Sequence, residues 1–325
     1  MEYSISIIRH SKDMPTLVCH NFFHSPDLFR IIEKTPGQTP YMLVATDDQG
    51  QIAGHMLVVL RRRGALMPPY LFTQGRVYGE GEYVNEAERE HIFGLMLNRL
   101  DQTLKRKLCL YIEFSNLSRK MFAYKEFRQC NYFPVQWMQI HNSLHSVSPE
   151  ERLSEKFMKR ITNATQLGVT VQEVKDETDV KQFYRVLHAH NRFRFLSYLP
   201  NERQFREMLS HEDHCRLYVC RQRDKVIGSG AVIYSKGDAY LWYFAAKSKV
   251  NPLLHPKTML LWHCVKTAHL DGCEHFYFMD AGLPFSRSHT REFVLGFGGK
   301  PVSSYRWFRF SIRWINRLLS WFYRE

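Results

Sequence analysis

The sequence lacks the features that would place it in a membrane, outside the cell or among disordered proteins. It contains no run of about 18 apolar residues, so no transmembrane helix is expected. Its first residues, 1–5, do not show the basic segment followed by an apolar one that marks a signal peptide. The apolar fraction of 44% and the charged fraction of 24% are ordinary for a globular chain. These observations predict a cytoplasmic protein.

Paired cysteines and familiar catalytic motifs are also lacking. The seven cysteines are odd in number and form no C-x-x-C pair, which predicts free, mostly buried thiols. Among the histidines, the best group for a metal is His211, His214 and Cys215, but no second ligand pair accompanies it, and no metal is expected. No phosphate-binding P-loop, no G-x-G-x-x-G after a strand and no nucleophile elbow occurs.

What the sequence has is length and positive charge. Its 325 residues suit two domains of about 150 residues each. Lysine and arginine exceed aspartate and glutamate by 45 − 32 = 13, giving a net charge of +13. Such a chain attracts phosphates, whether in nucleic acid, anionic lipid or a phosphorylated cofactor, and the charge does not choose among them.

An internal repeat sets the expected architecture. Residues 41–58 have the pattern of a strand, a polar turn and a second strand, and the same pattern returns at 216–233. Gly54 matches Gly228 in this repeat, and Val58 matches Val232. Repetition of such a pattern at a distance of about half the chain indicates two similar domains.

The segments around each hairpin repeat as well. A helix precedes each hairpin, and a long amphipathic helix, a short apolar strand, a further helix and a last strand follow it. In the first half these segments are 25–34, 85–105, 108–114, 118–129 and 135–140; in the second half they are 178–191 with 201–209, 257–270, 275–279, 290–295 and 301–308. A long loop is expected at 68–82.

This order of elements is that of the GNAT acyltransferase fold, so the predicted fold class is α/β with two tandem GNAT-like domains. Each would be a mixed sheet flanked by helices. The predicted domains are residues 1–147 and 148–304, with a joining helix at 148–167 and a basic amphipathic tail at 305–325.

Several motifs resemble the FemABX-like branch of the GNAT superfamily. The stretch 153–169 resembles its S-x-K-x-x-x-x-I-x-x-A-x-x-x-G-V segment, and 258–272 resembles its LLW…A…G helix. Residues 278–282 resemble its YDFGG strand end, and 296–302 resemble its GFGGxxV close. Residues 70–77 resemble its P-x-x-x-G-P-V loop. The resemblance covers nearly the whole chain and is more specific in the second half.

The resemblance implies a transferase that moves an acyl or aminoacyl group onto an amine. The family adds amino acids from aminoacyl-tRNA to peptidoglycan precursors, or acetylates substrates in polysaccharide and small-molecule pathways. The acceptor would be a cell-envelope, polysaccharide or small-molecule amine. The donor would be acyl-CoA or aminoacyl-tRNA, used as a co-substrate, with no tightly bound cofactor. Two other readings stay open: an acetyl-CoA-dependent amino-sugar N-acetyltransferase, and a non-catalytic member that binds tRNA or anionic lipid.

The sequence departs from the family pattern at two places. The GNAT pyrophosphate loop, (Q/R)-x-x-G-x-(G/A), is absent, and residues 251–258 stand in its place. Residues 292–295 stand where the peptidoglycan members usually carry a lysine before GFGG. The first departure weakens coenzyme A as the donor, and the second weakens the family's contact with a substrate phosphate.

The candidate site residues fall into three groups. Asp280, at the end of an apolar strand, and Tyr243 are the expected catalytic residues, with a turn cap and core packing as their structural alternatives. The expected donor-binding residues are Lys257, Thr258 and Trp262. The expected acceptor-binding residues are Arg76 and Glu80 in the loop 68–82, and Arg192 and Arg194 in a run that interleaves arginine with aromatic residues.

The tail 305–325 carries five arginines and one acid, Glu325. Arginines fall on one side of a helical projection, and tryptophan, leucine and phenylalanine fall on the other. A basic amphipathic helix of this kind suits peripheral contact with an anionic membrane, or docking onto the first domain.

Overall fold

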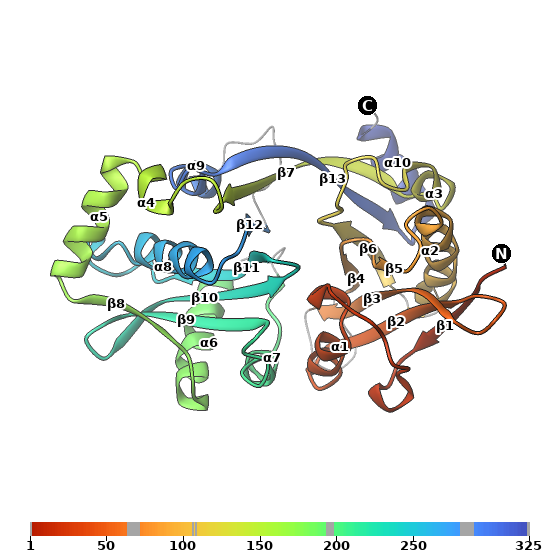
Figure 1. The fold of residues 1–325 in the computed structure, drawn as a ribbon, viewed down its shortest axis with the longest axis horizontal. Coiled ribbons are helices and arrows are strands. Elements are labelled where there is room, and N and C mark those ends of the chain that lie inside the picture. The colour runs from red at the N-terminus through yellow and green to blue at the C-terminus, as the bar shows by residue number, and fades with distance from the viewer. Residues whose placement is uncertain are drawn as a thin grey trace. The chain divides into compact units, whose positions relative to one another are not determined.

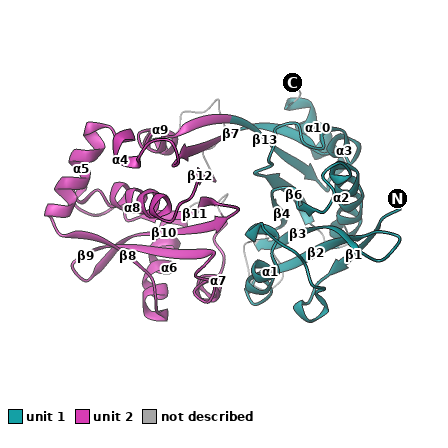
Figure 2. Ribbon diagram, viewed as in Figure 1, with its two compact units in different colours: residues 1–137, 303–325 teal, residues 138–302 magenta. Residues whose placement is uncertain are grey.

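The fold was analysed in a computed structural model of the chain, which describes residues 2–63, 72–105, 107, 109–192, 198–279 and 289–323 (Figure 1). The chain forms two compact units, shown in different colours in Figure 2. Unit 1 contains residues 1–137 and 303–325, and unit 2 contains residues 138–302. The predicted boundaries at 147/148 and 304/305 separate the two halves of the sequence repeat, whereas these units divide inside strands.

Unit 1 is built on a mixed sheet with the strand order β1-β2-β3-β4-β6-β13-β7. Its strands are β1 (Ser4–Ile8), β2 (Gln38–Thr46), β3 (Ile52–Arg63), β4 (Phe72–Tyr78), β6 (Cys109–Ser115), β13 (Lys300–Phe310) and the start of β7 (Phe133–Ser143), with the short β5 (Glu82–Tyr83) beside β3. The first predicted hairpin is confirmed, with Met42 opposite Leu57. β4 and β6 run parallel, and their described neighbours pair antiparallel.

Helices cover both faces of the unit 1 sheet because both faces carry apolar side chains. Tyr41, Leu43 and Ala45 belong to a core that also holds the apolar side chains of α2. Met42 and Val44 alternate with them and are also buried, on the face where α1 packs against β2. The helices of the unit are α1 (Pro26–Glu33), α2 (Arg89–Lys105), α3 (Tyr124–Gln129) and α10 (Arg313–Phe322), with 3-10 turns η1 (Ser11–Asp13) and η2 (Phe22–His24).

Three predictions for unit 1 are corrected. The loop expected at 68–82 contains the strand β4. The helix expected from residue 85 begins at Arg89, because the Asn85 side chain accepts a hydrogen bond from the Ala87 amide in a preceding turn. The helix expected at 118–129 is α3 alone, since Ala123 has a left-handed backbone with φ of 46°.

Unit 2 repeats this plan with the strand order β7-β12-β11-β10-β9-β8. Besides β7 its strands are β8 (Val169–Glu173), β9 (Cys215–Gln222), β10 (Lys225–Ser235), β11 (Asp238–Ala246) and β12 (His275–Phe278). The second predicted hairpin is confirmed, with Gly228 opposite Cys220. β11 and β12 are parallel, as β4 and β6 are in unit 1.

The closing strand of each sheet comes from the other half of the sequence repeat. β7 follows the first half, yet it pairs with β12 in unit 2. β13 follows the second half, yet it pairs with β6 in unit 1. Each sheet is therefore completed by a strand that its own half of the repeat does not supply.

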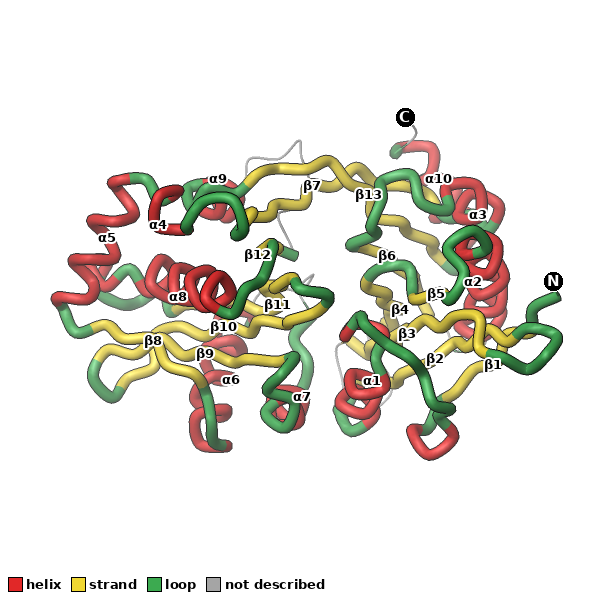
Figure 3. Tube along the Cα trace, viewed as in Figure 1, coloured by secondary structure: helices red, strands yellow, loops and turns green. Residues whose placement is uncertain are grey.

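Helices also lie on both faces of the unit 2 sheet (Figures 1 and 3). α8 packs its apolar side chains on one face, and α6 and α7 pack on the other. The helices are α4 (Pro149–Arg152), α5 (Glu155–Gln166), α6 (Glu177–Asn191), α7 (Glu202–Met208), α8 (Pro256–Leu270) and α9 (His289–Leu295), with the 3-10 turn η3 (Pro252–Leu254). The joining helix predicted at 148–167 is divided into α4 and α5 because the chain is extended at Leu153 and Ser154.

Within the described residues, no helix has the length and apolar character needed to cross a membrane.

Candidate active site

The central parallel pair of unit 2 is formed by β11 and β12. The described part of their ladder pairs Ala239, Tyr240 and Leu241 with Phe276, Tyr277 and Phe278. β11 itself continues to Ala246 along β10. Because the two strands are parallel, their carboxyl ends lie on the same side of the sheet.

A β-bulge lies in β11 directly after its last described pair with β12. Ala231 of β10 faces Tyr243, and its neighbour Val232 faces Leu241, so Trp242 is an extra residue on β11. A bulge re-aims the side chains and backbone groups next to it.

The bulge turns Tyr243 toward the helices α6 and α7. Leu241 and Phe244 pack against the core that includes α8, whereas the Tyr243 ring lies 5.1 Å from the ring of Phe205 in α7. The Trp242 ring lies 5.1 Å from that of Tyr243. Tyr243 is half-buried, so its side chain lies in a partly apolar setting near the carboxyl end of β11.

The connection from β11 to α8 occupies the position expected for donor binding. It contains η3, then His255 with a left-handed backbone (φ of 40°), and Pro256 in the first turn of α8. The first turn of α8 holds no acidic residue, and Lys257 in it is exposed. A helix N-terminus with a lysine favours phosphate groups.

The other two predicted donor residues lie deeper. Thr258 is only 3% exposed, so its side chain packs under the helix rather than facing solvent. Trp262, one turn further along α8, is half-buried, and the ammonium of Lys266 lies 5.9 Å from its ring centre. The structure thus places Lys257 at the surface of this region and the other two residues beneath it.

The predicted acceptor residues of unit 2 are described only in part. Arg192 is the C-cap of α6, on the helix that faces β11, and is exposed. Arg194 and the predicted catalytic residue Asp280 lie outside the described residues.

In unit 1, Arg76 belongs to a buried group of charged side chains. The guanidinium of Arg76 contacts the carboxylate of Glu113 and donates to the Ser115 hydroxyl at 2.9 Å. Glu113 also accepts from Arg306 at 3.1 Å and from the Gln74 amide at 3.0 Å. Burial would raise the pKa of Glu113, but Arg76 and Arg306 hold that pKa below its ordinary value.

A third arginine joins this group, which we call the arginine cluster: Arg61, Arg76, Arg306 and Glu113. Arg61 donates to the Tyr78 hydroxyl at 3.1 Å and adds to the positive charge acting on Glu113. Its four members are each less than a tenth exposed. Of these four residues, only Arg76 was predicted from the sequence; Glu113 could have been noticed as a charged residue within an apolar strand.

Glu80, the second acceptor residue predicted in unit 1, lies in the turn after β4. Its carboxylate accepts a hydrogen bond from the Ser118 amide at 2.9 Å and another from the Ser118 hydroxyl. β4 and β6 are parallel, so Glu80 and Ser118 lie at the same edge of the sheet as Arg76 and Ser115. The contacts show Glu80 joining two turns at this edge.

Three histidines of unit 2 lie close together near the amino-terminal starts of β11 and β12. His275 bonds to the carboxylate of Asp238 at 3.1 Å, and its ring lies 5.3 Å from that of His141 and 5.4 Å from that of His145. Burial lowers the pKa of His141, and the charges of His275 and Lys300 lower it further.

Comparison with known families identifies this unit. Residues 152–287 match the family model described as "Acetyltransferase (GNAT) domain". This match covers the strands β11 and β12, the helices α5 to α8 and the connection that carries Lys257. The GNAT prediction is thereby confirmed for unit 2, and with it the class of acyl-transferring enzymes. Among proteins of curated function, none matches the sequence.

Solved structures with the same fold cover almost the whole chain. FemX has a TM-score of 0.63 at 11% identity, with 98% of this chain and 100% of that chain covered. L-PGS from Bacillus licheniformis has a TM-score of 0.60 at 11% identity, covering 91% and 92%. A tandem GNAT protein from the clavulanic acid biosynthesis pathway has a TM-score of 0.59 at 10% identity, covering 95% and 99%. The predicted fold of two tandem GNAT-like domains is confirmed, and the similarity to FemX is one of fold.

Proposed function

We propose that unit 2 catalyses transfer of an acyl or aminoacyl group to an amine, at the carboxyl ends of β11 and β12. The observation that carries this proposal is the bulge at Trp242 on β11, which turns Tyr243 toward α7 in a strand that leads to the acid-free start of α8. Backbone N–H groups at this end of β11 would hold the oxygen of the acyl carbonyl.

The reaction requires an uncharged amine, a stabilised oxyanion and a proton for the leaving group. The amine nitrogen attacks the ester or thioester carbonyl, forming the new C–N bond, and the oxyanion that develops is held by backbone N–H groups of β11. Collapse of this intermediate breaks the bond to the carrier. We propose that Tyr243 gives its hydroxyl proton to the leaving group, and that Asp280 accepts the proton released by the amine.

For the donor we propose acyl-CoA or aminoacyl-tRNA, each of which carries phosphate groups in the same molecule as its reactive acyl group. Lys257 and the start of α8 would bind that phosphate. Thr258 and Trp262 would support the first turn of the helix from beneath, as their burial suggests.

For the acceptor we propose an amine that carries negative charge, such as a cell-envelope, polysaccharide or small-molecule precursor. Arg192 and Arg194 would bind such an acceptor in unit 2. Within unit 1, Arg76 and Glu80 are also proposed to bind an acceptor group, because the arginine cluster sets three guanidiniums against one carboxylate and so carries positive charge.

Ligand-dependent thermal stabilisation tests the donor. A ligand that binds the folded protein raises its Tm by an amount that grows with the ratio of ligand concentration to Kd, so acetyl-CoA, a long-chain acyl-CoA and a charged tRNA can be compared directly. A rise with either acyl-CoA, accompanied by acylation of an amine, assigns that donor; a rise with charged tRNA alone assigns the aminoacyl donor. No rise with any of them, together with salt-sensitive binding of uncharged tRNA, would favour the non-catalytic reading.

We further propose that α10 brings the protein to an anionic membrane surface. Its apolar residues Trp314, Leu318, Trp321 and Phe322 are 67%, 54%, 69% and 70% exposed. Asn316 attaches the helix to unit 1, through the Phe310 amide at 2.8 Å and the Asn131 carbonyl at 3.0 Å. Asn316 is thus buried, whereas the four apolar side chains remain exposed and are suited to the lipid interface.

Only part of the positive charge of residues 305–325 lies on α10. Arg306 and Arg309 lie in β13, paired with Glu113 and Asp101, so they belong to unit 1 rather than to the amphipathic helix. Arg313 and Arg317 remain exposed on α10. Each basic residue near an anionic membrane surface contributes about 1 kcal/mol to the binding free energy. The apolar side chains of α10 must therefore supply much of the free energy of membrane binding.

Vesicle sedimentation with the full-length protein tests the membrane proposal. The double variant Trp314→Ala, Trp321→Ala should pellet far less with anionic vesicles, while Met121→Ala, which removes another exposed apolar side chain of unit 1, should pellet like the original protein. Equal pelleting of all three proteins would show that α10 does not bind lipid.

A further inference from the structure

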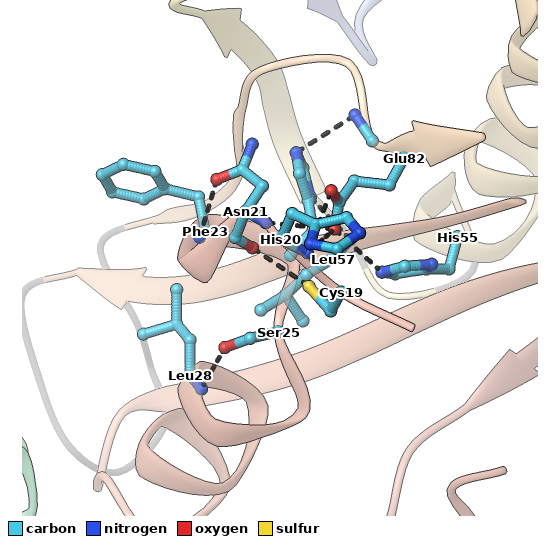
Figure 4. Close-up of polar contacts among 11 residues, drawn as sticks. Cys19, His20, Asn21, Phe23, Ser25, Leu28, His55, Leu57 and Glu82 are labelled. Carbon is cyan, nitrogen blue, oxygen red and sulfur yellow. Dashed lines mark hydrogen bonds and ion pairs between the residues drawn. The ribbon is translucent and has the colours of Figure 1, made fainter. Parts of the chain in front are cut away.

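Three segments of unit 1 bring together a thiol, an imidazole and a carboxylate. Cys19 lies in the extended segment before η2, His55 lies in β3, and Glu82 lies in β5 (Figure 4). One ligand atom of each lies within 4.8 Å of the corresponding atoms of the other two. Nε2 of His55 and Oε2 of Glu82 are 3.6 Å apart.

Backbone contacts hold two of these groups in place. The carboxylate of Glu82 accepts from the His20 amide at 3.1 and 3.0 Å and from the Asn21 amide at 3.2 Å. The Cys19 thiol lies 3.2 Å from the Asn21 carbonyl oxygen. Hydrogen bonds of this kind orient the ligands of metal sites, because they leave the carboxylate lone pairs aimed in fixed directions.

The arrangement has the donor set and the spacing of a zinc site. Zinc binds thiolate, imidazole and carboxylate at about 2.0 to 2.3 Å in tetrahedral geometry, which puts neighbouring ligand atoms roughly 3.3 to 3.8 Å apart. The His55–Glu82 distance already falls in this range. The Cys19 side chain is only partly buried, so it can close toward an ion by rotating about its own bonds.

We propose that Cys19, His55 and Glu82 bind one zinc ion, with a water molecule or a further side chain as the fourth ligand. Binding requires the thiolate, so the thiol proton of Cys19 is released to solvent as the S–Zn bond forms, and no electron is transferred. The histidine-rich group that the sequence singled out, His211, His214 and Cys215, is not such a group among the described residues, where His214 lies 3.2 Å from the Tyr234 carbonyl oxygen.

The site would fix the turn between β4 and β5. That turn carries Glu80, and its Gly81 amide lies 3.1 Å from the His24 ring in η2. Gly81 has φ of 101°, a conformation that favours glycine. A zinc ion joining Cys19 to Glu82 would hold the segment before η2 against β5, and so would stabilise this edge of unit 1. This proposal does not depend on the function proposed for unit 2.

Without metal the same atoms would form an ion pair of His55 with Glu82, backed by the two amides. That pair would not need the Cys19 thiol, which makes Cys19 the residue that separates the two interpretations. Cys19→Ser removes the thiolate and leaves the His55–Glu82 pair intact. Cys130→Ser, at a buried thiol elsewhere in unit 1, is the matched control.

Metal content and cobalt absorption test the proposal. The full-length protein, kept reduced without chelators, is loaded with Zn²⁺, dialysed and analysed for bound metal, and is separately titrated with Co²⁺. We expect one zinc per chain, bound at least about tenfold more weakly by Cys19→Ser and by Glu82→Gln and normally by Cys130→Ser. We also expect a thiolate-to-cobalt absorption band that only Cys19→Ser and Glu82→Gln weaken.

The proposal fails if the original protein retains no zinc after loading, or if Cys19→Ser binds zinc and Co²⁺ as the original protein does. Should Glu82→Gln not fold, Cys19→Ser decides alone, because the Cys19 side chain is partly exposed and serine conserves its size.

Discussion

The two units share one order of elements but differ in the side chains beside the central parallel pair. In unit 2, the described pairing of β11 with β12 reaches Leu241, and a bulge at Trp242 follows on β11. In unit 1, β4 and β6 pair from Thr73 to Tyr78. The face of unit 1 at this place holds the arginine cluster, whereas the corresponding face of unit 2 holds aromatic side chains around Tyr243.

The same order of elements thus carries different side chains in the two units. A bulge re-aims the residues next to it, and in unit 2 it turns Tyr243 toward α7. A buried group of charges instead demands that its partners stay in place, because an unpaired buried charge is costly. These differences support the proposal that acyl transfer takes place in unit 2 and that the arginine cluster stabilises unit 1.

The largest effect is expected from Glu113→Gln, which removes the only carboxylate of the arginine cluster. Three guanidiniums would then lose their shared counter-charge, and the free energy of unfolding of unit 1 should fall by about 3 to 5 kcal/mol. Hydrogen exchange of the β6 amides measures this loss. Glu90→Gln, at an exposed carboxylate of α2, is the control. A loss under about 1 kcal/mol would mean that the cluster does not stabilise unit 1.

The next largest effect is expected on catalysis, at Tyr243 of unit 2. Tyr243→Phe should lower kcat about 100-fold if the hydroxyl gives a proton to the leaving group, with little change in Tm. Tyr240→Phe is the matched control, because Tyr240 lies on the same strand where β12 is still paired. Similar kcat values for the two variants would show that Tyr243 only packs against Phe205.

A smaller effect is expected at the start of α8. Lys257→Ala should raise the KM for the acyl donor about tenfold and leave kcat nearly unchanged, since one charge-assisted contact to phosphate is lost. Lys181→Ala, at an exposed lysine of α6, should leave both values as they are. An equal rise in KM for the two variants would point to general charge attraction instead of a defined phosphate site.

The smallest effect is a response to acid that is opposite in the two units. Burial lowers the pKa of His141 in unit 2, so its contribution to stability is lost as the pH falls below the unfolded value of about 6.5. Burial raises the pKa of Asp101 in unit 1 to about 6, against the opposing influence of Arg309 and the Tyr132 hydroxyl. Its contribution is therefore lost as the pH rises through about 6, and is regained on acidification.

Between pH 7 and pH 5, these two groups should shift the Tm of their units by a few degrees in opposite directions. His141→Gln should reduce the acid-induced loss in unit 2, and Asp101→Asn should remove the acid-induced gain in unit 1. Calorimetry of both variants at the two pH values measures this. Parallel shifts of both variants relative to the original protein would contradict the assignment.

Much of the fold was predictable from local pattern. The two hairpins, the long helices after them and the strands beginning near residues 109 and 275 follow from alternation, apolar periodicity and turn residues. β4 was not predicted, because Gly75 and the preceding Pro68 and Pro69 gave the segment the composition of a loop. The break between α4 and α5 was also missed, since Ser154 fits a helix pattern as well as a cap.

The candidate site was predictable only where it follows from the repeat. The pattern places Tyr243 on a strand and Lys257 at a helix start, because both positions are fixed by their neighbours in sequence. Glu113 and Arg306 could not be joined to Arg76, since they are separated from it by 37 and 230 positions. The thiol, imidazole and carboxylate of the proposed zinc site likewise come from three separate segments.

By itself the sequence determined the element order, its duplication and the resemblance to acyltransferases, because short-range periodicity and motifs carry that information. Only the tertiary structure decided that β7 completes the sheet of unit 2 and β13 that of unit 1. Both closing strands have similar lengths and apolar character, so their local sequences suit either sheet. The choice depends on register and packing against β12 and β6, and these are interactions between residues far apart in the chain.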